Sequence, residues 1–377
     1  MNIRKTPSRP RAVLVSLDIG RASKTDERAG EAARLAESAG AQVVEVIRGR
    51  RDRPDSSTFA GKGKVEEIGL ALLEHKANVV IFDRQLSPAQ VRNLERALID
   101  KVPDIRVFDR TDVILDIFAQ RARTSEGKLQ VELARLEHLY TRLVKGWTHL
   151  ERQRGSLGKT GGPGEKQIEL DRRMIGEQVK KLKERLRKVG TVRDTQRAGR
   201  TRSGILRVAL VGYTNAGKST LFNRITGAEA YVADQLFATL DTTTRRVYLA
   251  DDASIALSDT VGFIRDLPHT LVDSFKATLE ETIQADLLLH VVDSASAQRD
   301  EQIAAVDEVL AEIGAAEVPR ILVYNQIDRA GLAPEIVRDA HGKILNIKVS
   351  AFTGAGIEGL RGALAESARN DSLPTAA

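Results

Sequence analysis

The sequence predicts an α/β protein in three parts: a parallel α/β domain (residues 1–120), a helical hairpin (121–205) and a second α/β domain with a mostly parallel six-stranded sheet (206–377). Three observations predict this. Short apolar runs alternate with helical patterns in the first and last parts, as in parallel α/β folds. Apolar residues of the middle part repeat every three or four positions, the period of long helices. The net charge also changes, from +3 to +12 to −9.

The N-terminal part contains four apolar runs that predict buried strands, at Ala12–Leu17, Gln42–Ile47, Asn78–Phe82 and Ile105–Phe108. The helical patterns between them are Glu27–Ser38, Lys64–His75 and Ser87–Ile99. The basic stretch Gly49–Gly63 is rich in Gly, Ser and Pro and predicts a loop. Its end, Gly61-Lys62-Gly63-Lys64, is rich in Gly and Lys before a helix, so a second nucleotide site here is an alternative, although the segment lacks P-loop spacing.

The middle part contains two apolar seams on long helices, formed by Leu129, Leu133, Leu136, Tyr140 and Leu143 and by Ile175, Val179, Leu182, Leu186 and Val189. The glycine-rich stretch Lys145–Lys166 separates them, so an antiparallel hairpin is expected. Cations flank Trp147 and His149 in this loop, a composition that suits phosphate contacts and base stacking: Lys145, Arg152, Arg154, Lys159 and Lys166. A packed linker with a solvated charged face is the alternative. Thr191–Gly204 is polar and basic and predicts a linker to the last part.

The composition excludes several classes of protein. The chain has no cysteine, which rules out disulfides, thiolate zinc sites and cysteine nucleophiles. No apolar run reaches the roughly 18–20 residues of a membrane span, and the N-terminus lacks the apolar core of a signal peptide. We therefore expect a soluble protein of the cytoplasm. We also expect a monomer, which can lie peripheral to the membrane. The net charge of +6 points to an anionic partner, which the charge distribution assigns to the middle part.

The last part alternates again. Its six predicted strands are Leu206–Val211, Arg246–Leu249, Ser254–Leu257, Leu287–Val292, Arg320–Tyr324 and Ile344–Val349. The predicted helices are Ser219–Ile225, Leu271–Gln284, Glu301–Ile313 and Ile357–Ala368. Most connections run from a strand through a helix to the next strand, which favours a mostly parallel sheet.

The first strand of this part runs into a phosphate-binding pattern, G-x-x-x-x-G-K-[ST], which spans Gly212, Tyr213, Thr214, Asn215, Ala216, Gly217, Lys218 and Ser219 and is followed by Thr220. Glycines let successive backbone N–H groups face a phosphate, and the helix N-terminus adds positive potential. Lys218 would bridge the β- and γ-phosphates, and the Ser219 hydroxyl would ligate Mg²⁺.

Three further motifs follow in order, each at a strand end. Asp259-Thr260-Val261-Gly262 would hold Mg²⁺ through water at Asp259 and sense the γ-phosphate at the Gly262 N–H. Asn325-Gln326-Ile327-Asp328 would read guanine, because Asp328 can accept from N1–H and from the 2-amino group, which adenine lacks. Ser350-Ala351, with Phe352 after it, would brace the base.

These motifs resemble a translation-factor-class, Ras-like G domain, and the whole chain resembles the HflX family of ribosome-associated GTPases. The family likeness is carried by Phe59–Ile68, Asp116–Leu133, Gly161–Arg173, Asp259–His269 and Phe237-Ala238-Thr239-Leu240-Asp241. The resemblance implies that Thr239 is the switch I ligand of Mg²⁺; without it Thr242, Thr243 and Thr244 are equal candidates. It also implies a GTPase that binds the large (50S) ribosomal subunit and its rRNA, acts on stalled or hibernating ribosomes and splits 70S particles.

Two residues of these motifs bear on the expected activity. Gln326 replaces the usual lysine of N-K-x-D, so we expect weaker nucleotide binding with unchanged base choice. Phe263 follows the D-x-x-G motif where Ras-like enzymes often carry glutamine, so intrinsic hydrolysis should be slow and accelerated by the ribosome. The catalytic set is then Lys218, Thr239 and Gly262. The alternatives are an ATP-dependent P-loop enzyme, against which Asp328 argues, and a weakly catalytic RNA-binding protein with a regulatory guanine-nucleotide site.

Overall fold

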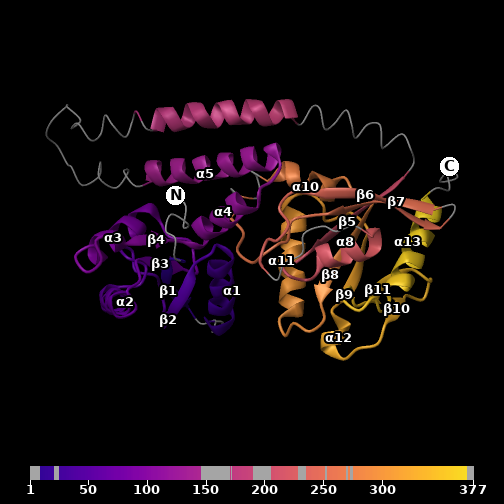
Figure 1. Ribbon diagram of the computed structural model, residues 1–377, viewed down its shortest axis with the longest axis horizontal. Coiled ribbons are helices and arrows are strands. Elements are labelled where there is room, and N and C mark those ends of the chain that lie inside the picture. Colours follow the sequence, from indigo (N-terminus) through magenta and orange to yellow (C-terminus); the bar gives the residue numbers. More distant parts are fainter. Residues whose placement is uncertain are drawn as a thin grey trace. The chain divides into compact units, whose positions relative to one another are not determined.

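The computed structural model describes residues 9–20, 25–145, 170, 172–189, 205–227, 235–250, 253–268, 271 and 275–371. The chain divides into two compact units, residues 1–120 with 131–184, and residues 121–130 with 185–377. Each unit is built on one sheet, and each is described by itself below (Figure 1). The cationic loop from Trp147 to Lys166 and the linker Thr191–Gly204 lie outside the described residues.

The sheet of the first unit has four parallel strands in the order β2-β1-β3-β4, which confirms the predicted parallel domain. The strands are β1 (Arg11–Ile19), β2 (Gln42–Arg51), β3 (Val79–Phe82) and β4 (Arg106–Phe108). Because β2 continues to Arg51 and the next helix begins at Lys62, the loop predicted over Gly49–Gly63 is shorter than expected.

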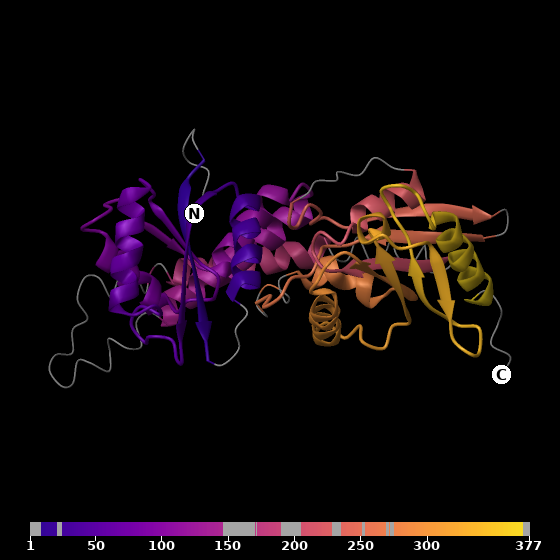
Figure 2. The same cartoon turned by 90° about the horizontal axis from the view of Figure 1, so that it is seen from below.

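Alternate residues of β1 face opposite sides of this sheet, and helices cover both sides. Val13, Val15 and Leu17 pack with apolar residues of α2 (Lys62–Glu74) and α3 (Pro88–Leu98) in one buried core. Helix α1 (Thr25–Ser38) packs against β1 and β2 on the other side, as Figure 2 shows. A capping box starts α3, in which Ser87 and Gln90 accept each other's backbone N–H.

Helix α4 (Arg110–Arg121) was not among the predicted elements. Nearly every residue from Arg110 to Phe118 is buried, so the segment has no polar face and no clear helical period. Helix α5 (Ser125–Lys145) and a helix over residues 172–189 confirm the two predicted helices of the middle part.

These two helices lie side by side in Figure 1. Lys183 pairs with Glu137 at 2.7 Å, and the Arg172 Nε donates to the Tyr140 hydroxyl at 3.2 Å. The predicted seam of the second helix is its least exposed part, with Leu182 buried. Outside this seam the helix is exposed and cationic, with Arg172, Arg173, Lys180, Lys181, Lys183, Arg185, Arg187 and Lys188.

The sheet of the second unit has seven strands, not the predicted six, in the order β10-β11-β9-β8-β5-β7-β6. The strands are β5 (Leu206–Gly212), β6 (Thr243–Ala250), β7 (Ala253–Asp259), β8 (Leu287–Asp293), β9 (Arg320–Asn325), β10 (Glu335–Arg338) and β11 (Ile344–Lys348). The missed strand β10 is a four-residue edge strand, mostly exposed, so it lacks the apolar run that marks a buried strand. Only β6 and β10 run antiparallel to their neighbours.

Helices cover both faces of this sheet as well. Apolar residues of α8 (Lys218–Thr226) and α13 (Ile357–Asp371) share one core with β5, while α10 (Lys276–Ile283) and α11 (Arg299–Glu312) contact β5 as well. The short α12 (Ile327–Ala330) follows β9. Among the described helices none is both long and apolar enough to cross a bilayer.

Candidate functional site

The turn from β5 into α8 is built for close approach of backbone to a ligand. Gly217 caps α8 with φ 89°, and a Cβ there would lie 2.3 Å from the Asn325 amide. Gly212 has φ 148°, and a Cβ there would lie 2.2 Å from the Val291 carbonyl. Both positions therefore need glycine for space as well as for conformation.

Lys218 begins α8 and its side chain is buried against this turn. Its Nζ donates to the carbonyls of Gly212 at 3.0 Å and Tyr213 at 2.8 Å. Burial lowers the pKa of Lys218 from 10.5 to about 8, although the Asp259 carboxylate partly offsets that effect. A buried cation held only by neutral carbonyls is a strong attractor for an anion such as a phosphate.

Three oxygen atoms meet beside Lys218. The Ser219 hydroxyl donates to Asp259 Oδ2 at 2.7 Å and lies 2.7 Å from the Thr239 hydroxyl, which is 3.2 Å from the same carboxylate oxygen. Burial raises the pKa of Asp259 above its ordinary value, while Ser219, Lys218 and Thr239 lower it. Asp259 Oδ1 is buried without a hydrogen-bond partner. Hydroxyl and carboxylate oxygens with one orphaned acceptor suit a magnesium ion, so the residues present fit that metal.

A pocket lies over these groups. It is lined by residues of the P-loop, of the segment before β6 and of the segment after β7: Thr214, Asn215, Gly217, Lys218, Ser219, Thr220, Gln235, Phe237, Ala238, Thr239, Thr260 and Gly262. Eleven of these twelve residues were predicted from motifs. Gln235 was missed, since it precedes the motif Phe237–Asp241 and only that adjacency could have signalled it.

The loops after β9 and β11 are fastened to the P-loop. The Asn325 side chain donates to the Ala216 carbonyl and accepts from the Ala351 N–H, both at 2.9 Å. The Gln326 Nε2 donates to the Asn215 carbonyl at 3.2 Å. The Asp328 carboxylate accepts from the Ser350 hydroxyl at 2.5 Å. The four sequence motifs therefore meet at one end of the sheet, as strand ends in a parallel sheet should.

Some predicted site residues point elsewhere. Leu240, Val261 and Ile327 are buried in the protein interior, Tyr213 is also buried, and Phe352 is 79% exposed. The Asp241 carboxylate reaches the start of α5 rather than the pocket. Phe263 is 1% exposed, its backbone hydrogen-bonds to Gly212 and Thr214, and its buried ring has no group that could hydrogen-bond a water.

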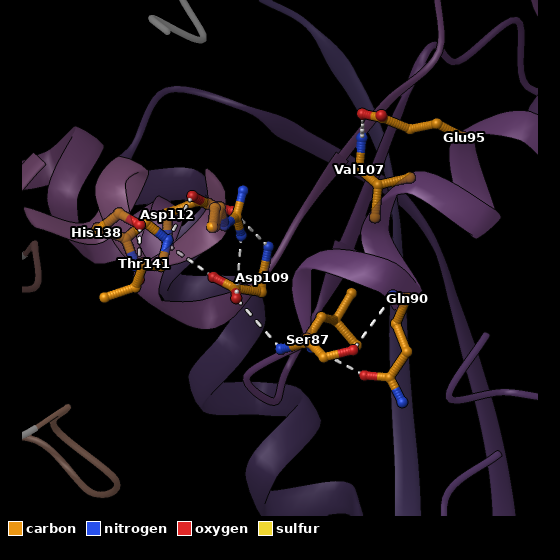
Figure 3. Close-up of polar contacts among 10 residues, drawn as sticks. Ser87, Gln90, Glu95, Val107, Asp109, Asp112, His138 and Thr141 are labelled. Carbon is orange, nitrogen blue, oxygen red and sulfur yellow. Dashed lines mark hydrogen bonds and ion pairs between the residues drawn. The ribbon is translucent and has the colours of Figure 1, made fainter. Parts of the chain in front are cut away.

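A second buried cluster of charges lies in the first unit, where α4 meets α5 (Figure 3). The Arg142 guanidinium contacts Asp112 at 2.6 Å and Asp109 at 3.1 Å, and His138 lies 3.1 Å from Asp112. Burial raises the pKa of Asp109, whereas His138 and Arg142 outweigh burial and lower that of Asp112. Asp109, Asp112 and His138 are close enough to ligate a metal, but Arg142 already supplies the positive charge.

Comparison with known proteins decides which GTPases this arrangement belongs with. Family models for the GTP-binding GTPase N-terminal region, the GTP-binding GTPase middle region and the 50S ribosome-binding GTPase match residues 26–119, 121–200 and 207–326. The chain is 55% identical to GTPase HflX of Escherichia coli K12 over 88% of its own length and 77% of that protein. It belongs to the HflX family of GTPases. GTPase HflX of Caldanaerobacter subterraneus is 45% identical, with 93% and 78% covered.

A solved structure shares this fold. The crystal structure of SsGBP in complex with GDP superposes with a TM-score of 0.52 and 25% sequence identity, covering 97% of this chain and all of that one. The HflX relatives and the P-loop fold identify the chain as a GTP hydrolase, and the family resemblance read from the motifs is confirmed.

Proposed function

We propose that this HflX-family protein binds the large ribosomal subunit in its GTP state and acts on stalled or hibernating ribosomes by splitting 70S particles. One observation carries the proposal: a pocket lined by side chains and backbone amides suited to Mg²⁺ and phosphate lies in the same chain as a helix with an exposed cationic surface. The match to a 50S ribosome-binding GTPase model supports the choice of partner. This role needs a cytoplasmic location.

In this proposal the P-loop amides and Lys218 bind the β- and γ-phosphates of GTP. Ser219 and Thr239 would hold Mg²⁺ directly and Asp259 through water, and a metal bound there would supply positive charge beside the phosphates. Gly262 can approach the γ-phosphate with its N–H because a Cβ there would lie 3.0 Å from Lys218 Nζ, a space that glycine leaves open.

Asp328 selects guanine. Ser350 positions the Asp328 carboxylate by donating a hydrogen bond to it at 2.5 Å. Gln326 donates to the P-loop carbonyl of Asn215. The buried ring of Phe263 cannot orient the attacking water, so the enzyme alone should turn over slowly. The ribosome would then supply the missing acceleration.

The cationic surface of the helix over residues 172–189 is the proposed rRNA contact. That helix exposes eight Lys and Arg side chains against two exposed Glu side chains, while its apolar seam packs inward. Cations that displace counterions from a phosphate backbone make affinity depend steeply on salt. Residues 206–377, whose net charge is −9, would stay at the edge of the RNA.

The proposal is tested by co-sedimentation with 50S subunits under GDP and under a non-hydrolysable GTP analogue, together with single-turnover GTP hydrolysis with and without subunits. We expect binding in the analogue state only, and faster hydrolysis with subunits. Thr239→Ala should abolish the difference between nucleotides while GDP affinity stays the same, and Thr243→Ala, a threonine at the start of β6, is the matched control. Equal binding in both states, or equally fast hydrolysis without subunits, would contradict the proposal.

A further inference from the structure

The segment that carries Thr239 is attached to the start of helix α5. Two residues beyond Thr239, Asp241 Oδ2 accepts the backbone N–H of Arg123 at 2.7 Å and of Thr124 at 3.0 Å. Its other oxygen accepts the Thr124 hydroxyl at 2.5 Å. All of these residues belong to the same compact unit.

Thr124 is at the same time the cap of α5. Its hydroxyl accepts the Gly127 N–H at 2.9 Å, and its carbonyl accepts the Lys128 N–H at 3.0 Å. A chain of hydrogen bonds therefore runs from Gly127 through the Thr124 hydroxyl to the Asp241 carboxylate. A negative charge at this position also interacts favourably with the positive end of the helix.

Gly127 leaves room for this contact. It lies in the first turn of α5 with no positive φ, and a Cβ at this position would lie 2.2 Å from Asp241 Oδ1, so a larger residue would displace the carboxylate. The Gly127 position reports on the Asp241 contact without touching the nucleotide pocket.

A second bond holds the other end of the segment. Arg121 donates to Gln235, which lines the pocket. Between the two attachments Thr239 points at Ser219 and Asp259. Residues 235–241 are thus anchored at both ends to residues 121–124, with the proposed Mg²⁺ ligand in the middle.

We propose that Asp241 is a positioning residue that couples the Thr239 segment to the first turn of α5, so that GTP binding and the order of that turn support each other. The inference rests on the proposed role of Thr239 in the GTP state. Coupling of this kind is reciprocal: whatever holds the start of α5 in place strengthens GTP binding to the same degree. GDP binding does not need Thr239, so GDP affinity should not depend on the contact between Asp241 and α5.

The test uses the full-length protein and three variants that break the contact from different sides: Thr124→Val, Gly127→Ala and Asp241→Asn. The valine keeps the shape of threonine but cannot donate, and the alanine displaces the carboxylate. Ser125→Ala, at the neighbouring exposed residue, is the matched control. Affinities for GDP and for a non-hydrolysable GTP analogue are measured by stopped-flow fluorescence, and amide hydrogen exchange is followed over residues 125–130.

We expect each of the three variants to weaken analogue binding about tenfold, the size of a lost hydrogen bond to a charged group, while GDP affinity stays within about twofold. Wild-type protein should protect the first turn of α5 more strongly with the analogue than with GDP. That difference should vanish in Thr124→Val and also in Thr239→Ala, which acts from the nucleotide side.

Unchanged analogue-to-GDP affinity ratios in Thr124→Val and Gly127→Ala would overturn the coupling. Failure of the proposed function looks different, since wild-type protein itself would then show no nucleotide-dependent binding to 50S subunits. Equal loss of GDP and analogue affinity in the variants would also overturn the inference, because it would indicate general damage to the fold.

Discussion

Two clusters of buried charge, one in each unit, differ in how completely the protein satisfies them. In the first unit all four carboxylate oxygens of Asp109 and Asp112 have partners, supplied by Arg142, His138 and backbone N–H groups, although the Nε of Arg142 has none. In the second unit Lys218 has only carbonyl partners, and Asp259 Oδ1 and Thr214 Oγ1 have none.

This difference separates stability from binding. A buried charge with all its partners inside the fold holds elements together, and removing one partner leaves the others uncompensated. A buried charge that lacks partners has lost its hydration without gaining equivalent interactions inside the protein, and a ligand can supply those interactions. The first cluster should therefore affect unfolding, and the second should affect nucleotide affinity.

The largest expected effect is on the first cluster. Arg142→Ala leaves two buried carboxylates facing each other, so the free energy of unfolding of the first unit should fall by roughly 3–5 kcal/mol. Urea denaturation followed by circular dichroism measures it. Lys128→Ala, an exposed cation on the same helix, should change stability by less than about 0.5 kcal/mol. If Arg142→Ala lost GTP affinity without losing stability, the first cluster would serve nucleotide binding and not stability.

The second cluster should respond in the opposite way. Lys218→Ala removes the cation that meets the phosphates, and nucleotide affinity should fall by about 100-fold or more, on the scale of a lost buried charge pair. Since Lys218 has no ion-pair partner in hydrogen-bonding contact, the unfolding midpoint of nucleotide-free protein should stay near that of wild type. Isothermal titration calorimetry measures the nucleotide affinity, and urea denaturation measures the unfolding midpoint. A strongly destabilised Lys218→Ala protein would make this lysine structural.

The sequence predicts the ligand-binding cluster better than the structural one. The P-loop, Asp259 and Asp328 follow strands at fixed spacings, because parallel strand ends bring such residues together whatever the intervening sequence. Asp109, Asp112, His138 and Arg142 belong to no spaced motif. They meet because α4 packs on α5, and α4 itself went unpredicted since it is buried nearly all round.

The same limit applies within the site. Asp241 is part of a recognisable motif, yet no pattern indicates that its carboxylate caps α5 more than a hundred positions away in the chain. The edge strand β10 was missed for a related reason: its pairing with β11 supplies backbone bonds but little apolar burial. The spacing of motifs along the chain does not predict contacts of this kind between distant segments.

His290 extends the comparison to a buried ring with one unpaired nitrogen. It lies on the central strand β8, 1% exposed, with Nδ1 unpaired. Burial lowers its pKa from 6.5 to about 4, with opposing contributions from Asp307 and Arg320. Between these values the unfolded chain binds a proton that the folded chain does not, so stability falls as pH drops below 6.5.

From pH 7 to pH 5.5 this titration should cost about 1 kcal/mol of unfolding free energy. His290→Leu should remove that part of the slope, whatever its own stability at pH 7. The measurement is a set of urea curves across this range for both proteins. Parallel pH dependences in the two proteins would show that His290 stays charged or solvated in the folded state.

The smallest expected effect concerns the side chain that takes the lysine position of the base motif. Gln326 has φ 62° and keeps the bond to the Asn215 carbonyl, while Arg329 donates to its amide oxygen. The neutral amide supplies the P-loop contact without the charge, so Gln326→Lys should tighten GDP and GTP binding by a few-fold, under about 1 kcal/mol.

Base choice should not change in Gln326→Lys, because Asp328 and its bond to Ser350 are untouched. Asp328→Asn is the contrasting variant, in which the preference for GTP over ATP should collapse, since an amide cannot accept from both guanine donors. Competition of labelled GDP with GTP and ATP measures both properties in one assay. A change of base preference in Gln326→Lys would mean that position 326 reads the base, and an unchanged affinity would mean that the hydrogen bond to Asn215 already provides all that a cation could add.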